Sequence, residues 1–303
     1  MAEILQLSII EFSTRTLITG TILHSPIHDK KKVTIGLKNA KHIVYSYHTK
    51  IFKNKPIAIL LRDKTVLTNT DNEGKFSVEL NAKSLGKIKI LDSILNKEIK
   101  CTQKYPVLFS KPNSRLNIVS DIDETIIKSY TKSLSKRIYT TLFKPAHKRK
   151  VIDFTKELFN FYKKQNSKFY YVSRSETNLF SLISHFITIN QLPKGPLLLT
   201  PYLNFKTLLK NKKDPDFKFK TIEKLLSFSK EEQFILIGDD SQRDIEIYTA
   251  IANKYGAQIS YIFIRQTKKK RSHLQNNSWL ILKKTGIKAY YYKKNESFNL
   301  DLL

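Results

Sequence analysis

The chain has 303 residues, and 41% of them are hydrophobic, which suits a globular protein with one large domain or two modest ones. Its apolar runs are strand-sized, far shorter than the roughly 18 residues of a membrane-spanning helix, so we expect no transmembrane helix. The 54 Lys and Arg residues against 26 Asp and Glu residues give a formal net charge of +28. This charge favours an anionic partner, namely nucleic acid, an acidic membrane surface or a phosphorylated small molecule. A compositional habit of the source organism explains the excess equally well.

The amino-terminal segment and the cysteine content favour a cytoplasmic location. Residues 1–10, "MAEILQLSII", have no basic start and are followed by no small-residue cleavage site, so we expect no secretory signal. Cys101 is the only cysteine, which excludes an intramolecular disulfide and a multi-thiolate metal site. We therefore expect a protein of a reducing compartment, with peripheral attachment to a membrane left open.

Short β-type runs fill the chain up to residue 112. They alternate in polarity or are rich in β-branched residues, and turn-type clusters such as "TNTDNEGK" at Thr68–Lys75 separate them. The runs are "KVTIGL", "HIVYSY", "IAILL" and "KFSVEL". This pattern predicts an antiparallel β-sandwich over residues 1–112, accessory in role because its turns carry no His or carboxylate cluster. "KPN" at Lys111–Asn113 marks the expected junction.

From residue 113 to residue 303, apolar strands alternate with helical periods, a pattern typical of a parallel sheet covered by helices. "DFTKELFNFYKK" has apolar residues at helical spacing, and "DIEIYTAIANKYG" ends on Gly256, a residue suited to end a helix. "GIKAYYYKK" predicts a final edge strand. The fold class is therefore α/β, with a Rossmann-like parallel sheet. The other predicted strands are Leu116–Ser120, Lys168–Ser173, Pro196–Thr200, Gln233–Gly238 and Ile259–Ile264.

Polar side chains gather where these strands end. In an open parallel sheet the ligand site lies beyond the carboxyl ends of the strands, so residues there can meet across long sequence gaps. The first strand is followed by "DIDET", the second ends in a serine, and the fourth runs into "GDDSQRD". The residues so placed are Asp121, Asp123, Thr125, Ser173, Asp239, Asp240 and Asp244.

Carboxylates that converge on one point repel one another, and burying them unpaired costs several kcal/mol each unless a cation neutralises them. Oxygen ligands without neighbouring His or Cys favour Mg²⁺ over zinc, and Mg²⁺ also accepts phosphate oxygens. The pattern therefore predicts magnesium-dependent phosphate chemistry. In that chemistry the carboxylate of Asp121 attacks phosphorus to form an aspartyl phosphate. Asp123, two residues on, protonates the leaving oxygen and then activates water.

Four motifs in this order resemble those of the haloacid dehalogenase superfamily of phosphatases. They are D-x-D-x-T after an apolar strand, a serine at a second strand end, a lysine before a helix, and an acidic Gly-Asp segment. More narrowly, "SDIDET", "YYVSRSETNLF", "KFKTIEKLL" and "FILIGDDSQRDIEIY" are similar to the actin-patch phosphatidate phosphatase family and its bacterial relatives, over roughly Leu116–Arg265. "TDNEGKF" at Thr70–Phe76 resembles a turn in the β-rich domain that precedes the catalytic domain in that family.

The resemblance implies a role for each matching residue. Asp121 becomes the nucleophile and Asp123 the acid and base. Ser173 hydrogen-bonds the phosphoryl group, Lys218 offsets its developing charge, and Thr125 holds the turn through its hydroxyl group. Mg²⁺ is implied as the cofactor, and its ligands or their orienting neighbours are Asp121, the backbone carbonyl of Asp123, Asp239 and Asp244.

The sequence departs from the family pattern within three of the motifs. The departures in the second and fourth motifs put the lipid preference in doubt more than they do hydrolysis. Lys220 remains a rival of Lys218, and Asp240 a rival of Asp244 beside the metal. The departures are Glu124 for Asp, Arg174 and Glu176 for Asn and Pro, and Asp240 and Ser241 for Ser and Gly.

A basic insert at about residues 126–150 precedes the helix that begins near Val151. It is too long for a simple turn and occupies the position of a flap or small cap. Its cations can attract an anionic membrane, or they can belong to a solvated charged loop. The run "KKKR" at Lys268–Arg271 follows the fifth strand and has the same two interpretations. The cations of the insert are Lys128, Lys132, Lys136, Arg137, Lys144, Lys148, Arg149 and Lys150.

Together these features favour a Mg²⁺-dependent phosphomonoesterase that acts on phosphatidate or a related lipid phosphate. One alternative is the same catalytic centre acting on a nucleic-acid phosphate or a soluble phosphate ester. A nucleic-acid enzyme should also have a basic groove with stacking aromatics, and activity that falls steeply with salt. The second alternative is a binding or scaffold protein with an idle centre, which is disfavoured because such a protein has no physical need for the carboxylates and the lysine.

Overall fold

The computed structural model describes residues 2–24, 47–81, 88–110, 115–127, 150–202, 214–293 and 296–299. The chain divides into two compact units, which are described one at a time. The first unit is Met1–Lys111 with the later segments Glu176–Ser184 and Thr200–Lys212, and the second is Pro112–Ser175, His185–Leu199 and Lys213–Leu303. Within the described ranges, no helix has both the length and the apolar character that crossing a bilayer requires.

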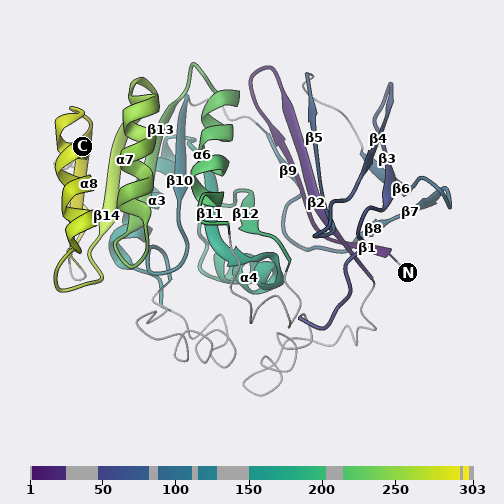
Figure 1. The fold of residues 1–303 in the computed structure, drawn as a ribbon, viewed down its shortest axis with the longest axis horizontal. Helices are drawn as coiled ribbons and strands as arrows, with labels where there is room; N and C mark the ends of the chain where they lie inside the picture. The colour runs from purple at the N-terminus through teal and green to yellow at the C-terminus, as the bar shows by residue number, and fades with distance from the viewer. Residues whose placement is uncertain are drawn as a thin grey trace. The chain divides into compact units, whose positions relative to one another are not determined.

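The first unit contains two β-sheets (Figure 1). They share an apolar core. Buried isoleucines from both sheets, among them Ile18, Ile22, Ile57 and Ile59, contribute to that core. One sheet has the strand order β5-β2-β1-β8, with β9 also paired to β1, and the other has the order β4-β3-β6-β7. The strands are β1 (Ala2–Glu11), β2 (Thr16–His24), β3 (Pro56–Leu60), β4 (Thr65–Asn69), β5 (Lys75–Leu80), β6 (Lys89–Asp92), β7 (Lys97–Glu98), β8 (Lys100–Cys101) and β9 (Leu108–Phe109).

The predicted β-rich architecture is confirmed, but its pairing is not purely antiparallel. β1 pairs in parallel with β8 and β9, which follow it by long connections rather than by hairpins. The predicted β-runs include neither β1 nor β2; in β1, Gln6 and Ser8 interrupt the apolar pattern even though both are buried. "IAILL" and "KFSVEL" fall on β3 and β5, whereas "KVTIGL" and, apart from Tyr47, "HIVYSY" lie outside the described residues.

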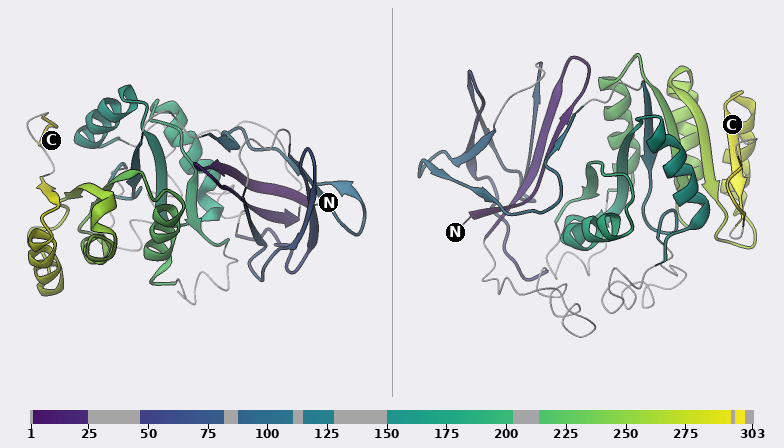
Figure 2. Two further views of the ribbon diagram at one scale, coloured as in Figure 1. Left: turned by 90° about the horizontal axis from the view of Figure 1, so that it is seen from above. Right: turned by 180° about the vertical axis from the view of Figure 1, so that it is seen from behind.

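The second unit is built on a six-stranded sheet in the order β12-β11-β10-β13-β14-β15. The pairs that run from β11 to β15 are all parallel. Helix α3 lies on one face of the sheet, and α6, α7 and α8 lie on the other (Figure 2). The strands are β10 (Leu116–Ser120), β11 (Lys168–Glu176), β12 (Leu197–Thr200), β13 (Gln233–Asp239), β14 (Ile259–Arg265) and β15 (Lys288–Tyr292). The helices that follow β10 along the chain are α3 (Asp153–Lys164), η2 (Thr177–Leu179), α4 (Phe180–Ile189), α6 (Phe217–Phe228), α7 (Asp244–Tyr255), η3 (Gly256–Gln258) and α8 (His273–Lys284), of which η2 and the first half of α4 belong to the first unit.

The predicted strands and helices of the parallel sheet are present. Ile118 and Val119 of β10 are fully buried, as expected for a strand covered on both faces. α3 buries Phe154 and Leu158, which are spaced one helical turn apart. Gly256 follows α7 as predicted, but with φ of −52° it stays in the helical region and opens η3.

Strand β10 lies where the order of the sheet reverses. β11 pairs with one edge of β10 and β13 with the other, so the chain connections lead away from β10 in both directions. Ligand sites of open α/β sheets lie at such reversals, beyond the carboxyl ends of the strands. The carboxyl ends of β10 and β13 are therefore the expected location of a site.

Candidate active site

Three carboxylates meet beyond the carboxyl ends of β10 and β13. Asp121 directly follows β10, Asp239 is the last residue of β13, and Asp244 is the first residue of α7. One oxygen from each lies within 4.8 Å of the other two, and all three side chains are buried. The backbone N–H of Asp121 donates to the carbonyl of Ile237 at 2.9 Å, which extends the β10–β13 pairing up to the cluster.

The approach of α7 to β13 depends on Gly238. A Cβ atom at this position would lie 2.5 Å from Oδ2 of Asp244 and 2.8 Å from the ring of Tyr248, so only glycine leaves room for these side chains. The N–H of Asp239 donates to Oδ2 of Asp244 at 3.3 Å. The hydroxyl of Tyr248 donates to the carbonyl of Ile237 at 3.0 Å. These contacts fix the first turns of α7 against the strand.

A buried lysine lies among the carboxylates. Nζ of Lys218, in the first turn of α6, is 2.5 Å from Oδ1 of Asp244 and 3.2 Å from Oδ1 of Asp121. Lys220 is 63% exposed, and its ammonium pairs with Asp214 at 3.0 Å. The structure thus brings Lys218 into the cluster and leaves Lys220 on the surface, because residues two apart on a helix point in different directions.

Burial sets the protonation of this cluster. It raises the pKa of Asp121 to about 7, against the opposing effect of Lys218 and with Asp244 adding to the rise. Burial, followed by the charges of Asp244 and Asp121, also raises the pKa of Asp239 well above its usual value. Burial alone would lower the pKa of Lys218, but Asp121 and Asp244 outweigh it and the net shift is upward. One ammonium therefore faces more carboxyl groups than it can neutralise.

The cluster fits a small divalent cation. Oδ2 of Asp121 is buried and accepts no hydrogen bond from any described residue, so an oxygen ligand is left over. Asp121, Asp239 and Asp244 are the residues that would hold the ion, and carboxylate oxygens are the ligands that Mg²⁺ prefers. Within the described part of the chain the group includes no His or Cys, which argues against zinc.

Asp123 faces a hydroxyl group from the neighbouring strand. Oγ of Ser175, in β11, donates to Oδ2 of Asp123 at 2.6 Å. The N–H of Ser175 donates to Oγ of Ser173 at 3.1 Å. Ser173 is a residue predicted from the sequence, whereas Ser175 is not; the signal for Ser175 is its position two residues on, and so on the same face of the strand. The side chain of Asp123 is thus held in one orientation at the edge of the site.

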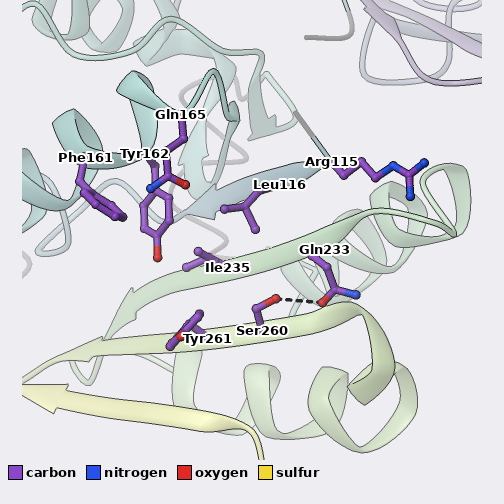
Figure 3. Close-up of a pocket in the computed structure, with 9 residues that line it drawn as sticks. All are labelled: Arg115, Leu116, Phe161, Tyr162, Gln165, Gln233, Ile235, Ser260 and Tyr261. Atoms are coloured by element: carbon purple, nitrogen blue, oxygen red, sulfur yellow. Dashed lines mark hydrogen bonds between the residues drawn. The ribbon is translucent and has the colours of Figure 1, made fainter. Parts of the chain in front are cut away.

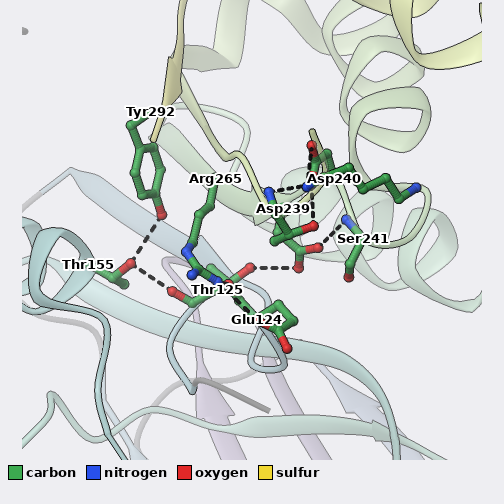
Figure 4. A network of polar contacts seen from close by, with 10 residues as sticks. Glu124, Thr125, Thr155, Asp239, Asp240, Ser241, Arg265 and Tyr292 are labelled. Carbon is green, nitrogen blue, oxygen red and sulfur yellow. Dashed lines mark hydrogen bonds and ion pairs between the residues drawn. The ribbon is translucent and has the colours of Figure 1, made fainter. Parts of the chain in front are cut away.

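A residue with a left-handed backbone shapes the turn between Asp123 and Thr125. Glu124 has φ of +59°, which is costly for a residue other than glycine. Arg265, at the end of β14, donates from Nη1 to the carbonyl and to Oε2 of Glu124, and both side chains are buried. Oγ1 of Thr125 donates to Oδ2 of Asp239 at 3.1 Å (Figure 4). Arg265 is the second residue that the sequence analysis missed, although it too is a polar residue at a strand end.

Asp240 turns away from the cluster. Its carboxylate accepts the N–H groups of Thr267 at 2.7 Å and Lys268 at 3.2 Å, and the hydroxyl of Tyr291. Successive residues of a strand point to opposite sides, which explains why Asp239 and Asp240 have different partners. Of the two residues considered beside the metal, the structure places Asp244 in the cluster.

A separate hollow lies at the opposite end of the strands from the carboxylate cluster. It has a volume of about 410 Å³ and is lined in part by Leu116 and Gln233, the first residues of β10 and β13 (Figure 3). No acidic side chain is among its lining residues. Because it lies at the amino ends of the strands, it is not part of the carboxylate site.

Most of the basic insert lies outside the described residues. Of its eight cations only Lys150 is described, and it is exposed. The expected contact between this insert and an anionic membrane stays a prediction.

The raised carboxyl pKa values predict how magnesium affects stability. The pKa of Asp121 is about 7 in the folded chain and about 4 in an unfolded one, so the folded state holds the extra proton. The metal-free protein should therefore lose stability as the pH rises from about 4 to about 7. Mg²⁺ binds the ionised carboxylates, so it should raise the melting temperature by several degrees more at about pH 8 than at about pH 5.

Sodium chloride at equal ionic strength is the control for this measurement, and Asp121→Asn should reduce the magnesium effect. An equal magnesium effect at both pH values, or none at either, would contradict the assignment of the cluster as a cation site.

Among the comparisons with known proteins, a family model matches the segment that carries this site. Residues 116–266 match the model of the family described as phosphatidate phosphatase APP1, catalytic domain. The chain is 28% identical over 167 residues to phosphatidate phosphatase APP1 of Saccharomyces cerevisiae, which covers 54% of this chain and 28% of that protein. It is 26% identical over 246 residues to an uncharacterized protein of Schizosaccharomyces pombe, which covers 76% of this chain and 38% of that protein.

The chain spans well under half the length of these two relatives. Among solved structures, a carbohydrate acetylesterase from Xanthomonas citri aligns over 94% of this chain and 66% of that one, with 10% identity and a TM-score of 0.30, too low to carry an argument. The segment matched by the family model begins at β10 and contains the three carboxylates and Lys218. The carboxylate site thus lies within the part of the chain, just under half of its length, that is similar to the phosphatidate phosphatase APP1 catalytic domain.

Proposed function

We propose that this chain is a Mg²⁺-dependent phosphatase of the haloacid dehalogenase type that hydrolyses a phosphomonoester, with phosphatidate or a related lipid phosphate as its substrate. The observation that carries the proposal is the buried cluster of Asp121, Asp239 and Asp244 around Lys218. This cluster lies within the segment that matches the APP1 catalytic domain. The name of the yeast relative supports a lipid phosphate as the substrate class.

Asp121 is the nucleophile in this reaction. Its carboxylate attacks the phosphorus atom and forms an aspartyl phosphate, while the bond from phosphorus to the ester oxygen breaks. The leaving alkoxide takes the proton of the Asp123 carboxyl group. A water molecule then attacks the aspartyl phosphate, gives its proton back to Asp123 and releases inorganic phosphate, so that Asp121 is restored.

The neighbouring side chains keep these two groups in position. The hydroxyl of Ser175 holds the carboxyl group of Asp123 at 2.6 Å, and Ser173 lies next to it to bind a phosphoryl oxygen. Lys218, 3.2 Å from Asp121, offsets negative charge as it develops on the phosphoryl group. When bound, Mg²⁺ would offset the charge of the carboxylates and polarise the phosphoryl oxygens.

The burial of the cluster argues against an idle scaffold. Replacing a buried ion pair by well-packed apolar residues is often neutral or stabilising, so a domain that needs only to fold gains nothing from these acids. Asp121, Asp239 and Asp244 are each 1% exposed or less. Such a costly arrangement is understandable where the charges take part in chemistry.

A panel of substrates tests the substrate class. With Mg²⁺ present, we expect phosphate release from phosphatidate to exceed that from a 3′-phosphorylated oligonucleotide by at least about tenfold in kcat/KM. Lysophosphatidate and a chromogenic phosphate ester complete the panel. Faster release from the oligonucleotide, with a steep fall as salt is added, would contradict the lipid assignment. If no substrate of the panel released phosphate, the result would contradict the proposal that the chain is a phosphatase.

The covalent route predicts different defects at the two catalytic carboxyls. Asp121→Asn removes the nucleophile, so turnover of p-nitrophenyl phosphate should fall at least about 10³-fold without any rapid first turnover. Asp123→Asn keeps the nucleophile, and nitrophenolate leaves without a proton. This variant should therefore release about one equivalent of nitrophenolate quickly and then stall. Retained turnover in the Asp121 variant would exclude the aspartyl phosphate.

Lys218 and Lys220 provide a matched pair of variants. Lys218→Met removes the buried ammonium and should lower kcat by about 10²- to 10³-fold. Lys220→Met removes only an exposed ion pair and should leave kcat within about twofold of wild type. Circular dichroism checks that both variants fold. Equal effects on kcat at the two positions would show that the cluster does not depend on Lys218.

A further inference from the structure

The carboxy-terminal part of the chain carries charge of one sign. From Ile247 to Asn295 the sequence contains eleven Lys and Arg residues and no Asp or Glu. Four of the cations form the run Lys268–Arg271, in the loop between β14 and α8, and Lys283 and Lys284 form the last turn of α8. Most of these six side chains are exposed. This part of the chain therefore presents a strongly basic surface.

Large apolar side chains share that surface. Leu274, Leu280 and Ile281 of α8 are 66%, 61% and 47% exposed, whereas Gln275 and Leu282 of the same helix are buried. α8 lies beside α7 (Figure 1). A short helix that exposes branched apolar residues among lysines is typical of segments that lie in a membrane interface.

Aromatic rings contact cations of both the basic loop and α8. The guanidinium carbon of Arg271 lies 5.1 Å from the ring centre of Trp279 and 4.6 Å from that of Tyr291. Nζ of Lys283 lies 5.4 Å from the ring centre of Trp279. Tryptophan and tyrosine beside Lys and Arg are the residues that gather at the headgroup level of membranes.

The same loop is attached to the carboxyl end of β13, where the carboxylate cluster lies. Asp240, the residue after Asp239 of the carboxylate cluster, accepts the N–H of Lys268 at 3.2 Å. Nε2 of Gln275, in the first turn of α8, donates to the carbonyls of Asp240 at 2.9 Å and Gln242 at 3.1 Å. The basic loop thus lies at the end of the sheet that carries the carboxylate cluster, where a phosphate ester has to enter.

We propose that the loop Lys268–Arg271 and the exposed face of α8, together termed the α8 surface, bind a bilayer that contains anionic lipid. The cations attract the surface to acidic headgroups, and Leu274, Leu280 and Ile281 enter the headgroup boundary. A nucleic acid would use the cations but has no partner for these exposed apolar side chains. The inference deepens the proposed function by naming the form in which the substrate is met, and it rests on that function only for the activity measurement below.

Vesicle sedimentation with the full chain tests the α8 surface without any catalysis. Phosphatidylcholine vesicles with about one third phosphatidylserine should bind the chain at least about tenfold more tightly than phosphatidylcholine alone. Leu274→Ser combined with Ile281→Ser should weaken binding to the anionic vesicles about tenfold. Lys269→Glu combined with Lys270→Glu should weaken it at least as much.

Two control variants match these changes. Lys163→Glu with Lys164→Glu makes the same charge change at the last turn of α3, where both lysines are exposed. Leu67→Ser makes the apolar change at a leucine that is 72% exposed in β4. Both controls should bind the anionic vesicles within about twofold of wild type. Equal losses in the controls, or full binding by the α8-surface variants, would overturn the inference.

A second outcome would also overturn it. If the lysine pair lowers binding to a duplex oligonucleotide while the leucine and isoleucine pair leaves vesicle binding intact, the α8 surface is a nucleic-acid surface.

An activity measurement separates this inference from the proposed function. The α8-surface variants should hydrolyse a soluble chromogenic ester within about twofold of wild type and lose hydrolysis of vesicle phosphatidate in step with binding. A wild-type chain that binds vesicles but hydrolyses no ester would refute the proposed function and leave the α8 surface standing.

Discussion

The carboxylate cluster beyond the ends of β10 and β13 depends on one buried ammonium. Nζ of Lys218 lies 2.5 Å from Asp244 and 3.2 Å from Asp121. A buried ammonium or a buried carboxylate would be costly alone, and each is tolerated here because the other is close. A single positive charge cannot balance the three acids, and burial therefore raises the carboxyl pKa values of Asp121 and Asp239. The site gives up stability to hold negative charge in one place, and the proposed Mg²⁺ would relieve this repulsion.

The last third of the chain supports the turn that carries the proposed nucleophile and acid. Arg265 holds the left-handed Glu124 from the end of β14. Tyr292 of β15 shares a hydrogen bond with Thr155 at 3.1 Å, and Thr155 donates to the carbonyl of Thr125 at 2.7 Å. β14 and β15 contribute no acid to the cluster, but they help to determine its geometry because they hold the turn after β10 on the side opposite to β11.

Most of the parallel sheet could be predicted from the sequence because its strands are continuous apolar runs. β10 has the predicted bounds, Leu116–Ser120, and the acids that follow the strands were identified from their positions alone. β1 could not be found in this way, because Gln6 and Ser8 are polar yet buried, and a rule that expects apolar residues inside a protein passes over such a strand.

The supporting contacts of the site were harder to predict than its acids. The choice of Lys218 over its rival Lys220 has a physical reason in helix geometry, since Lys218 and the buried Ile222 are one turn apart. Ser175 and Arg265 could not be paired with Asp123 and Glu124, because their partners are remote in sequence and only the tertiary fold brings them together. The end of β13 shows a related property: Asp239 and Asp240 face opposite sides, one toward the other acids and one toward the loop after β14. Deleting a single residue within this strand would move Asp240 to the cluster position and Asp239 to the position of Gly238, where a Cβ atom does not fit, so the length of β13 matters to the site as much as the side chains that end it.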